Sequence, residues 1–246
     1  MQFGLQLYNF RRELASDFRG TMREIAKLGF DGVEFAGDYG KLPPDEVAAL
    51  LRELKLRCAG TMFSIEDAMN PDGPAYGYVT KLESPASTFS MMTDFFREYK
   101  TVLAQLCTAG RAAAAHGKVF SYHNHWDELA PLDGIPVLER FLAETDPTQV
   151  FCEPDICWLN RGGVDAAGFI RRYASRIRQI HFKDILIADD LQSTTELGRG
   201  IINLPRAWAA AREIDCPWVI YEQDNSTDPF RSAAASLACL KKMAGY

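Results

Sequence analysis

The sequence comprises 246 residues, of which 47% are hydrophobic and 24% charged, and its formal net charge is -6. The acidic balance argues against nucleic acid as a partner, because phosphate binding usually requires a basic face. No apolar run approaches the roughly 18 residues of a membrane helix, and the amino terminus lacks the basic and apolar regions of a secretory signal, so we expect a cytoplasmic protein without a membrane partner.

Short runs rich in Val, Ile and Phe alternate along the chain with longer helical patterns, which is typical of β/α units that form a parallel sheet. Strand candidates recur at fairly even intervals, at residues 3–8, 32–35, 57–62, 77–80, 119–123, 150–153, 177–182 and 218–221. Eight strands close a barrel. Because no linker interrupts the chain, we predict one α/β domain over residues 1–246, a single (β/α)8 TIM barrel.

Helical patterns occupy the intervals between these strands. The clearest predicted helix covers 17–28, with Ser16 as a cap and Gly29 as its stop, and the next opens at Pro43 and Pro44. A long helix is expected over 87–116, interrupted at Gly110, with further helices over 169–174 and 230–243.

Residues 64–84 contain two prolines and two glycines, so the third helix is expected to be reduced. This segment is either an active-site flap or an irregular connection. The six cysteines form no CxxC pair, which predicts buried thiols rather than disulfides or a zinc knuckle.

Side chains suited to metal binding or acid–base chemistry follow four of the predicted strands, at the barrel face that carries active sites. His123, Asp155, His181 and Glu222 take corresponding positions in successive units, separated by 32, 26 and 41 residues. We therefore predict that they surround one divalent metal ion. Mixed nitrogen and oxygen donors favour Mn²⁺, with Co²⁺, Zn²⁺, Fe²⁺ or Mg²⁺ as alternatives. His116, at a helix end, is expected only to interact with that terminus.

Five motifs carry a resemblance: YHNH at 122–125, EPDICWLNRGG at 153–163, IHFKD at 180–184, LGRG at 197–200 and VIYEQD at 219–224. Together with the opening LQLYNFR and the phrase FDGVEFAG, they resemble the sugar phosphate isomerase/epimerase family of the xylose isomerase-like barrel superfamily. The resemblance implies a metal held by Asp155, His181 and Glu222. At the fifth strand His123 stands where many epimerases have a glutamate, so Glu128 or water remains an alternative fourth ligand.

The resemblance implies a metal-dependent isomerase or epimerase that acts on a small sugar or polyol-like molecule. Glu222, Glu153 or His123 would serve as a base beside a carbonyl polarised by the metal, and His125 and Lys183 would contact the oxyanion or leaving group. The alternative for Lys183 is a structural ion pair with Asp184 or Glu153. Because one of the usual two acids is missing, elimination remains open, as in the similar inosose dehydratases and enzymes of 3-keto glycosides.

Four further residues are predicted to contact the substrate: Glu34, Asn124, Trp158 and Arg199. A structural hydrogen bond is the alternative for Glu34, and an aromatic plug below the site is the alternative for Trp158. Arg199 is weak evidence for a phosphate. A homo-oligomer formed through the helices is a further expectation.

Two other functional classes remain as alternatives. A metal-dependent phosphodiesterase of the abasic-site endonuclease kind would need about three metals and more than the four histidines present. A noncatalytic barrel subunit would explain the missing glutamate at the fifth strand.

Overall fold

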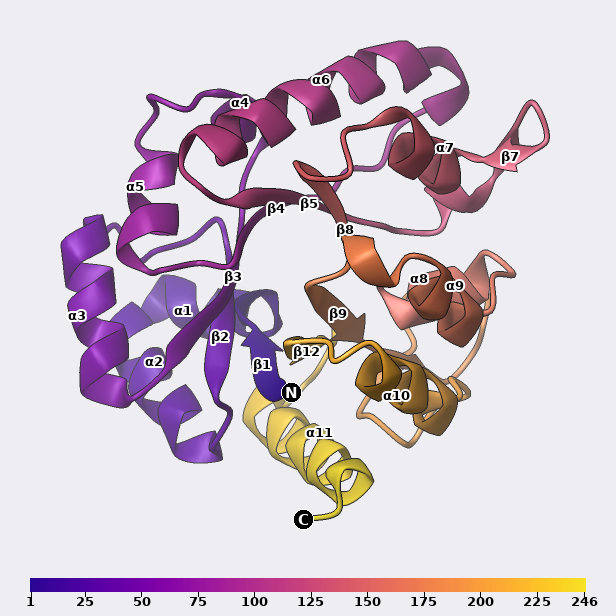
Figure 1. The fold of residues 1–246 in the computed structure, drawn as a ribbon. Helices are drawn as coiled ribbons and strands as arrows, with labels where there is room; N and C mark the ends of the chain where they lie inside the picture. Colours follow the sequence, from indigo (N-terminus) through magenta and orange to yellow (C-terminus); the bar gives the residue numbers. More distant parts are fainter.

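The computed structural model describes all 246 residues and shows a ring of parallel strands surrounded by helices (Figure 1). The strands hydrogen-bond in the order β8-β5-β4-β3-β2-β1-β12-β9. Their bounds are β1 (Gln2–Gln6), β2 (Gly32–Ala36), β3 (Arg57–Met62), β4 (Ala86–Phe89), β5 (Val119–His123), β8 (Val150–Glu153), β9 (Gln179–Phe182) and β12 (Trp218–Tyr221). The predicted (β/α)8 barrel is confirmed.

Side chains alternate along each strand between the helices and the barrel interior. In β9, Ile180 and Phe182 belong to the main hydrophobic core, whereas Gln179 and His181 are buried polar residues. In β2, Val33 and Phe35 flank the buried Glu34 in the same way. Apolar residues therefore hold the helices on the sheet, and polar residues collect inside the ring.

Helices form the outer ring around these strands (Figure 1). They are α1 (Arg11–Ser16), α2 (Phe18–Leu28), α3 (Pro44–Leu54), α6 (Phe95–Ala115), α7 (Val137–Glu144), α8 (Ile156–Arg161), α9 (Ala166–Arg172), α10 (Leu204–Glu213) and α11 (Pro229–Ala244). Helix α2 ends at Gly29, which has a φ of 90°, as the sequence predicts. Its cap is Asp17 rather than Ser16, because the Asp17 carboxylate accepts the Gly20 N–H.

The predicted secondary structure is wrong in the connection from β3 to β4. Residues 77–80 lie in helix α5 (Ala75–Lys81), and the fourth strand is Ala86–Phe89, inside the predicted long helix. Tyr76 and Val79 are three residues apart and both buried, so this segment buries one helical face. The long helix begins at Phe95 and runs through Gly110 without a break.

Two short helices, α4 (Ile65–Met69) and α5, replace a full third helix, so its predicted reduction is confirmed. The Tyr76 hydroxyl donates to the Ala68 carbonyl at 2.8 Å and ties these helices together. His116 stacks on Tyr76, with ring centroids 4.5 Å apart. The segment is thus a packed connection.

Short elements complete the chain. They are η1 (Leu7–Phe10), η2 (Asp127–Leu129), η3 (Ala174–Arg176), and the two-residue strands β6 (Pro131–Leu132), β7 (Ile135–Pro136), β10 (Asp184–Ile185) and β11 (Thr194–Thr195). β6 pairs with β7 and β10 pairs with β11, both antiparallel.

The barrel closes between β8 and β9 through a seam without a regular ladder. Only the isolated bridges Cys152↔Ile177 and Asp155↔His181 join these strands. The buried Arg176 reinforces the seam, because its guanidinium donates to the Val150 and Leu142 carbonyls at 2.7 Å each.

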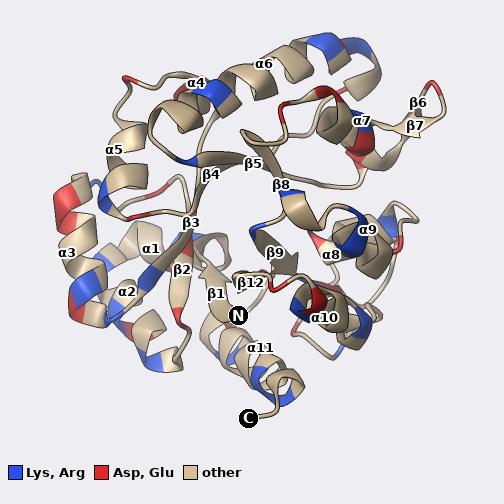
Figure 2. Ribbon diagram, in the orientation of Figure 1, with Lys and Arg blue, Asp and Glu red and all other residues tan.

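Charges of both signs are interspersed over the outer helices α2, α3 and α10 (Figure 2). No helix is long and apolar enough to span a membrane. All six cysteines are free, and four of them are buried.

Candidate metal centre and active site

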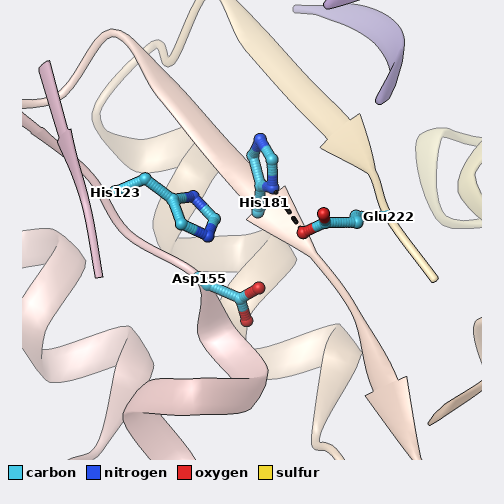
Figure 3. A group of neighbouring side chains, drawn as sticks. All are labelled: His123, Asp155, His181 and Glu222. Atoms are coloured by element: carbon cyan, nitrogen blue, oxygen red, sulfur yellow. Dashed lines mark hydrogen bonds and ion pairs between the residues drawn. The ribbon is translucent and has the colours of Figure 1, made fainter. Parts of the chain in front are cut away.

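His123, Asp155, His181 and Glu222 meet at one end of the barrel (Figure 3). His123 is the last residue of β5, Asp155 follows β8, His181 lies in β9 and Glu222 follows β12. One ligand atom from each lies within 4.8 Å of the others, and all four residues are buried. Strand ends that are far apart in the sequence therefore bring two imidazoles and two carboxylates to one point.

The four residues fit a divalent cation. Asp155 Oδ2 and His123 Nδ1 are buried and have no hydrogen-bond partner. Such atoms are costly unless a ligand satisfies them. A set of two nitrogen and two oxygen donors suits Mn²⁺ or a neighbouring transition metal. Glu128, the alternative fourth ligand, instead accepts the Tyr122 hydroxyl at 2.6 Å.

Glu34 lies beneath these residues, within the barrel. Its Oε2 is 2.6 Å from His181 Nε2 and accepts the Gln6 amide at 2.8 Å. A carboxylate on the far nitrogen of a ligating histidine fixes its ring and tautomer. The structure therefore places Glu34 in a position that orients His181, and Glu34 does not line the cavity above.

A local irregularity provides room for Glu34. The β2–β3 register shifts between Val33 and Glu34, so that Glu34 lies opposite Gly60. A Cβ at Gly60 would stand 2.1 Å from Glu34 Oε1 and 2.3 Å from Gln179 Nε2. Only glycine leaves space for this buried polar layer.

Glu153 belongs to the same lower layer. Its Oε2 is 3.4 Å from His123 Nδ1 and 3.5 Å from His181 Nε2, and neither oxygen is hydrogen-bonded. Burial and the nearby Glu34 carboxylate raise the pKa of Glu153 well above its ordinary value. Glu153 does not line the cavity, and it contacts the two histidines of the candidate metal site from within the barrel.

Lys183 is fully buried and surrounded by carboxylates. Its Nζ is 2.9 Å from Glu222, 3.0 Å from Asp224 and 3.4 Å from Asp155. Burial lowers the pKa of Lys183, but Asp224 and Glu222 outweigh it and hold that pKa well above its ordinary value. The side chain is thus an ammonium. It pairs with neither Asp184 nor Glu153, the partners that the sequence suggested.

The charges of the candidate metal ligands are coupled. Burial raises the pKa of Asp155 to about 6. Burial also opposes ionisation of Glu222, but Lys183 and His181 hold the pKa of that carboxyl well below its usual range. Burial lowers the pKa of His181, yet Glu153 and Glu34 raise it well above its ordinary value. The carboxylates of the cluster outnumber its cationic side chains, Lys183 and His181. This excess of negative charge favours binding of a further positive charge.

A cavity of about 380 Å³ opens above the cluster, and we call it the site cavity. Its polar lining includes His123, His125, Lys183 and Glu222. Its apolar lining comes from Tyr8, Ala36, Met62, Met92, Trp126, Trp158 and Leu191. Lys183 Nζ stands 4.6 Å from the centre of the Trp158 ring. Polar groups on one side and aromatic faces on the other suit a small sugar or cyclitol.

The structure brings His125 and Trp158 to this cavity but not Asn124 or Arg199. Asn124 is buried, and its Oδ1 accepts the Asp155 N–H at 3.1 Å, so it ties the end of β5 to the loop after β8. Arg199 is 58% exposed in its side chain and contacts Glu196.

Several residues at or near the site were not among the predicted site residues. Asp184 accepts the N–H groups of Gly198 and Gly200, and a Cβ at Gly200 would stand 2.2 Å from Asp184 Oδ1. This contact explains the LGRG glycines as a close approach to a carboxylate. Asp224 follows Glu222 by two residues, a spacing that places both on one side of an extended chain. Tyr8 and Trp126 line the site cavity, but no sequence pattern points to either of them.

Comparison with known proteins agrees with this geometry. A family model described as "Xylose isomerase-like TIM barrel" matches residues 22–243. The chain is 24% identical over 195 residues to an inosose dehydratase of Salmonella typhimurium, a match that covers 68% of this chain and 63% of that protein, less than two thirds of its length.

Solved structures share the fold at low identity. A sugar phosphate isomerase/epimerase from Parabacteroides distasonis is 22% identical with a TM-score of 0.79, covering 98% of this chain and 93% of the other. A 3-keto-D-glucoside 4-epimerase from E. coli is 17% identical with a TM-score of 0.77, covering 98% and 99%.

Proposed function

The chain belongs to the xylose isomerase-like TIM barrel family, and on that premise we propose that it is a metal-dependent enzyme that removes a proton beside a carbonyl group of a sugar or cyclitol. One observation carries the proposal: two histidines and two carboxylates have ligand atoms within 4.8 Å of one another, and two of the four, His123 and Glu222, line a cavity together with His125 and Lys183. His123, Asp155, His181 and Glu222 would hold one divalent ion, with Mn²⁺ favoured. Such an ion polarises a substrate carbonyl.

His125 is the side chain best suited to accept the proton. Burial and the neighbouring Lys183 lower the pKa of its imidazole, so the ring is neutral near pH 7. A neutral imidazole that faces the substrate is a competent general base. The Glu128 carboxylate accepts the backbone N–H of His125 at 3.2 Å and holds this loop in place.

Lys183 supplies the complementary group. Its ammonium lines the site cavity and can donate hydrogen bonds to an oxygen that gains negative charge or leaves. Trp158 and Trp126 provide aromatic faces for the C–H surface of the ring. Glu153 and Glu34, both fully buried, would hold the charge and orientation of His123 and His181.

Elimination is the reaction that these groups favour. The C–H bond breaks as His125 takes the proton, the C–O bond at the next carbon breaks, a carbon–carbon double bond forms, and the departing hydroxide leaves as water after protonation. An epimerisation with two acids would need carboxylates on opposite sides of the substrate, but the two that line the cavity, Glu222 and Asp224, both come from the segment after β12 and both contact Lys183. The similarity to an inosose dehydratase supports the same choice.

Isomerisation or epimerisation is the second candidate. Glu222 lines the cavity and offers one carboxylate beside the substrate, opposite in sign to Lys183. The proton would then return to the substrate, and no group would leave.

The test is incubation of the Mn²⁺-loaded protein in D₂O with ketoses, inososes and 3-keto glycosides. Release of water or aglycone indicates elimination, and deuterium incorporation without loss of a group indicates isomerisation. His181→Ala and Glu222→Ala should each lose bound metal and all exchange, whereas the control His116→Ala, far from the site, should keep both. A metal-replete and active His181→Ala variant would refute the proposed centre.

A further inference from the structure

A second hollow lies beside the site cavity, and we call it the polar hollow. It measures about 550 Å³, and all of its lining side chains except Pro229 are polar or charged. Its walls come from the segments that follow β1, β9 and β12, three neighbouring strands of the sheet. It therefore stands at the active face of the barrel, over a different sector from the metal-binding residues.

The two hollows adjoin. Four residues line both of them: Arg11, Gln192, Asp224 and Asn225. After β12 the chain alternates between them, because Glu222 lines only the site cavity and Gln223 only the polar hollow. Asp224 accepts a hydrogen bond from Lys183 at 3.2 Å, so the shared wall contacts a group of the reacting centre directly.

The walls of the polar hollow are held in place by hydrogen bonds. The Gln223 amide accepts the Tyr221 hydroxyl at 2.6 Å and donates to the Asn225 carbonyl at 2.7 Å. Asn9 Oδ1 accepts the Gln223 N–H at 2.9 Å. Asn9 is 9% exposed, and its Nδ2 has no partner. A buried donor without a partner in a fixed wall is what a ligand hydroxyl would satisfy.

The charges of the lining select the kind of ligand. Two cationic side chains, Arg11 and Arg12, are outnumbered by three carboxylates, those of Glu13, Glu196 and Asp224. Phosphate recognition would require an excess of positive charge. The remaining lining consists mainly of amide and hydroxyl side chains, which donate and accept hydrogen bonds. This mixture suits an uncharged group with many hydroxyls.

We propose that the polar hollow is a second sugar subsite and that the substrate carries two linked polyhydroxylated rings. The inference rests on the proposed function, which places the reacting ring over the metal. The site cavity alone is within the roughly 300–1,000 Å³ range of small-ligand pockets, so one ring leaves the polar hollow free. The second ring lies against Asn9, Gln223 and Asn225.

Two variants test the subsite without touching the reacting centre. Asn9→Asp keeps the oxygen that accepts from Gln223 and removes the Nδ2 donor. Thr227→Trp fills the hollow from an exposed position, and Thr101→Trp on the exposed face of α6 is its matched control. The probes are 3-keto-glucose and 3-keto-trehalose, which differ by one glucose ring. Kd and kcat/KM are measured on the Mn²⁺-loaded protein, with inorganic phosphate as a competitor.

We expect the wild type to bind 3-keto-trehalose at least roughly tenfold more tightly than 3-keto-glucose. Asn9→Asp should remove roughly tenfold of that preference, because a lost hydrogen bond to a ligand is worth about that much, and Thr227→Trp should remove the preference by occupying the space of the second ring. Neither variant should change the values for 3-keto-glucose, and Thr101→Trp should change nothing.

Equal affinities for the two probes in the wild type, a preference that Thr227→Trp leaves intact, or competition by phosphate would each overturn the subsite. Failure of the proposed function looks different. In that case no probe exchanges a proton in D₂O, while 3-keto-trehalose still binds and Thr227→Trp still weakens its binding.

Discussion

Replacing Lys183 by Met tests the charge balance of the site most directly. The ammonium lies within 3.4 Å of Glu222, Asp224 and Asp155, and all but Asp224 of this group are nearly or fully buried. Removing one partner of a buried ion pair costs roughly 3–5 kcal/mol, because the remaining charge loses its compensation. In a domain of this size each kcal/mol lowers Tm by about 2–4 °C. The metal-free variant should therefore melt roughly 6–20 °C below the wild type.

The assay is thermal unfolding of both proteins with EDTA and with excess Mn²⁺. Added Mn²⁺ should raise the Tm of Lys183→Met more than that of the wild type, because a bound cation compensates the same carboxylates. Lys100→Met, at an exposed position on α6, is the control and should match the wild type. A metal-free Lys183→Met protein that melts within 2 °C of the wild type, an interval set as roughly the effect of 1 kcal/mol, would refute this account.

Two further predictions follow from the buried carboxylates. Glu34→Gln should weaken Mn²⁺ binding by roughly 10–100-fold in calorimetry without unfolding the protein, because it disturbs the contact that orients His181, whereas the exposed Glu46→Gln should leave binding unchanged. Burial raises the pKa of Glu128 from 4.5 to about 7. Its raised folded-state pKa stabilises the protein fully below the unfolded value of 4.5, and that stability is lost as the pH rises through about 7. Between pH 5 and pH 8, denaturant unfolding should show a decline in stability that is smaller in Glu128→Gln by about 2.5 kcal/mol, because Asp155 and Glu153, whose pKa values are also raised, contribute to the decline in both proteins; a variant with the same decline as the wild type would contradict the assignment.

The barrel could be predicted from the sequence because the composition of most of its strands is typical of β-structure. Residues 119–123 and 218–221, for example, have strong strand preferences and are followed by polar residues. The predicted bounds of these two strands therefore agree with the structure. The prediction of the fourth strand was wrong for two reasons. Ala86–Phe89 contains two small residues and one aromatic residue, which is a weak strand signal, whereas Tyr78 and Val79 in α5 have strong strand preferences. Burial of a helical face by Tyr76 and Val79 overrides those preferences.

The predicted metal-binding residues come together because strand ends of one barrel share one face, a rule that spacing alone can apply. Residues that lie deeper in the barrel cannot be distinguished from the predicted ligands in the sequence. Glu34 and Glu153 follow the same strand pattern as the ligands, and only the alternation of side chains together with the shifted β2–β3 register places them below the cavity. The polar hollow escaped prediction because its lining combines three segments that are remote in the sequence.

A cation in the proposed site would have a mechanical role at the closure between β8 and β9. Asp155 and His181 face each other across the one joint that lacks a regular ladder. A cation held by both residues would link β8 and β9 where the barrel has the fewest backbone hydrogen bonds. The cofactor would therefore stabilise the closed barrel as well as take part in the reaction. Backbone amides of β8 and β9 should then exchange with solvent faster after chelation, while those of β2 and β3, on the opposite side of the barrel, keep their rates.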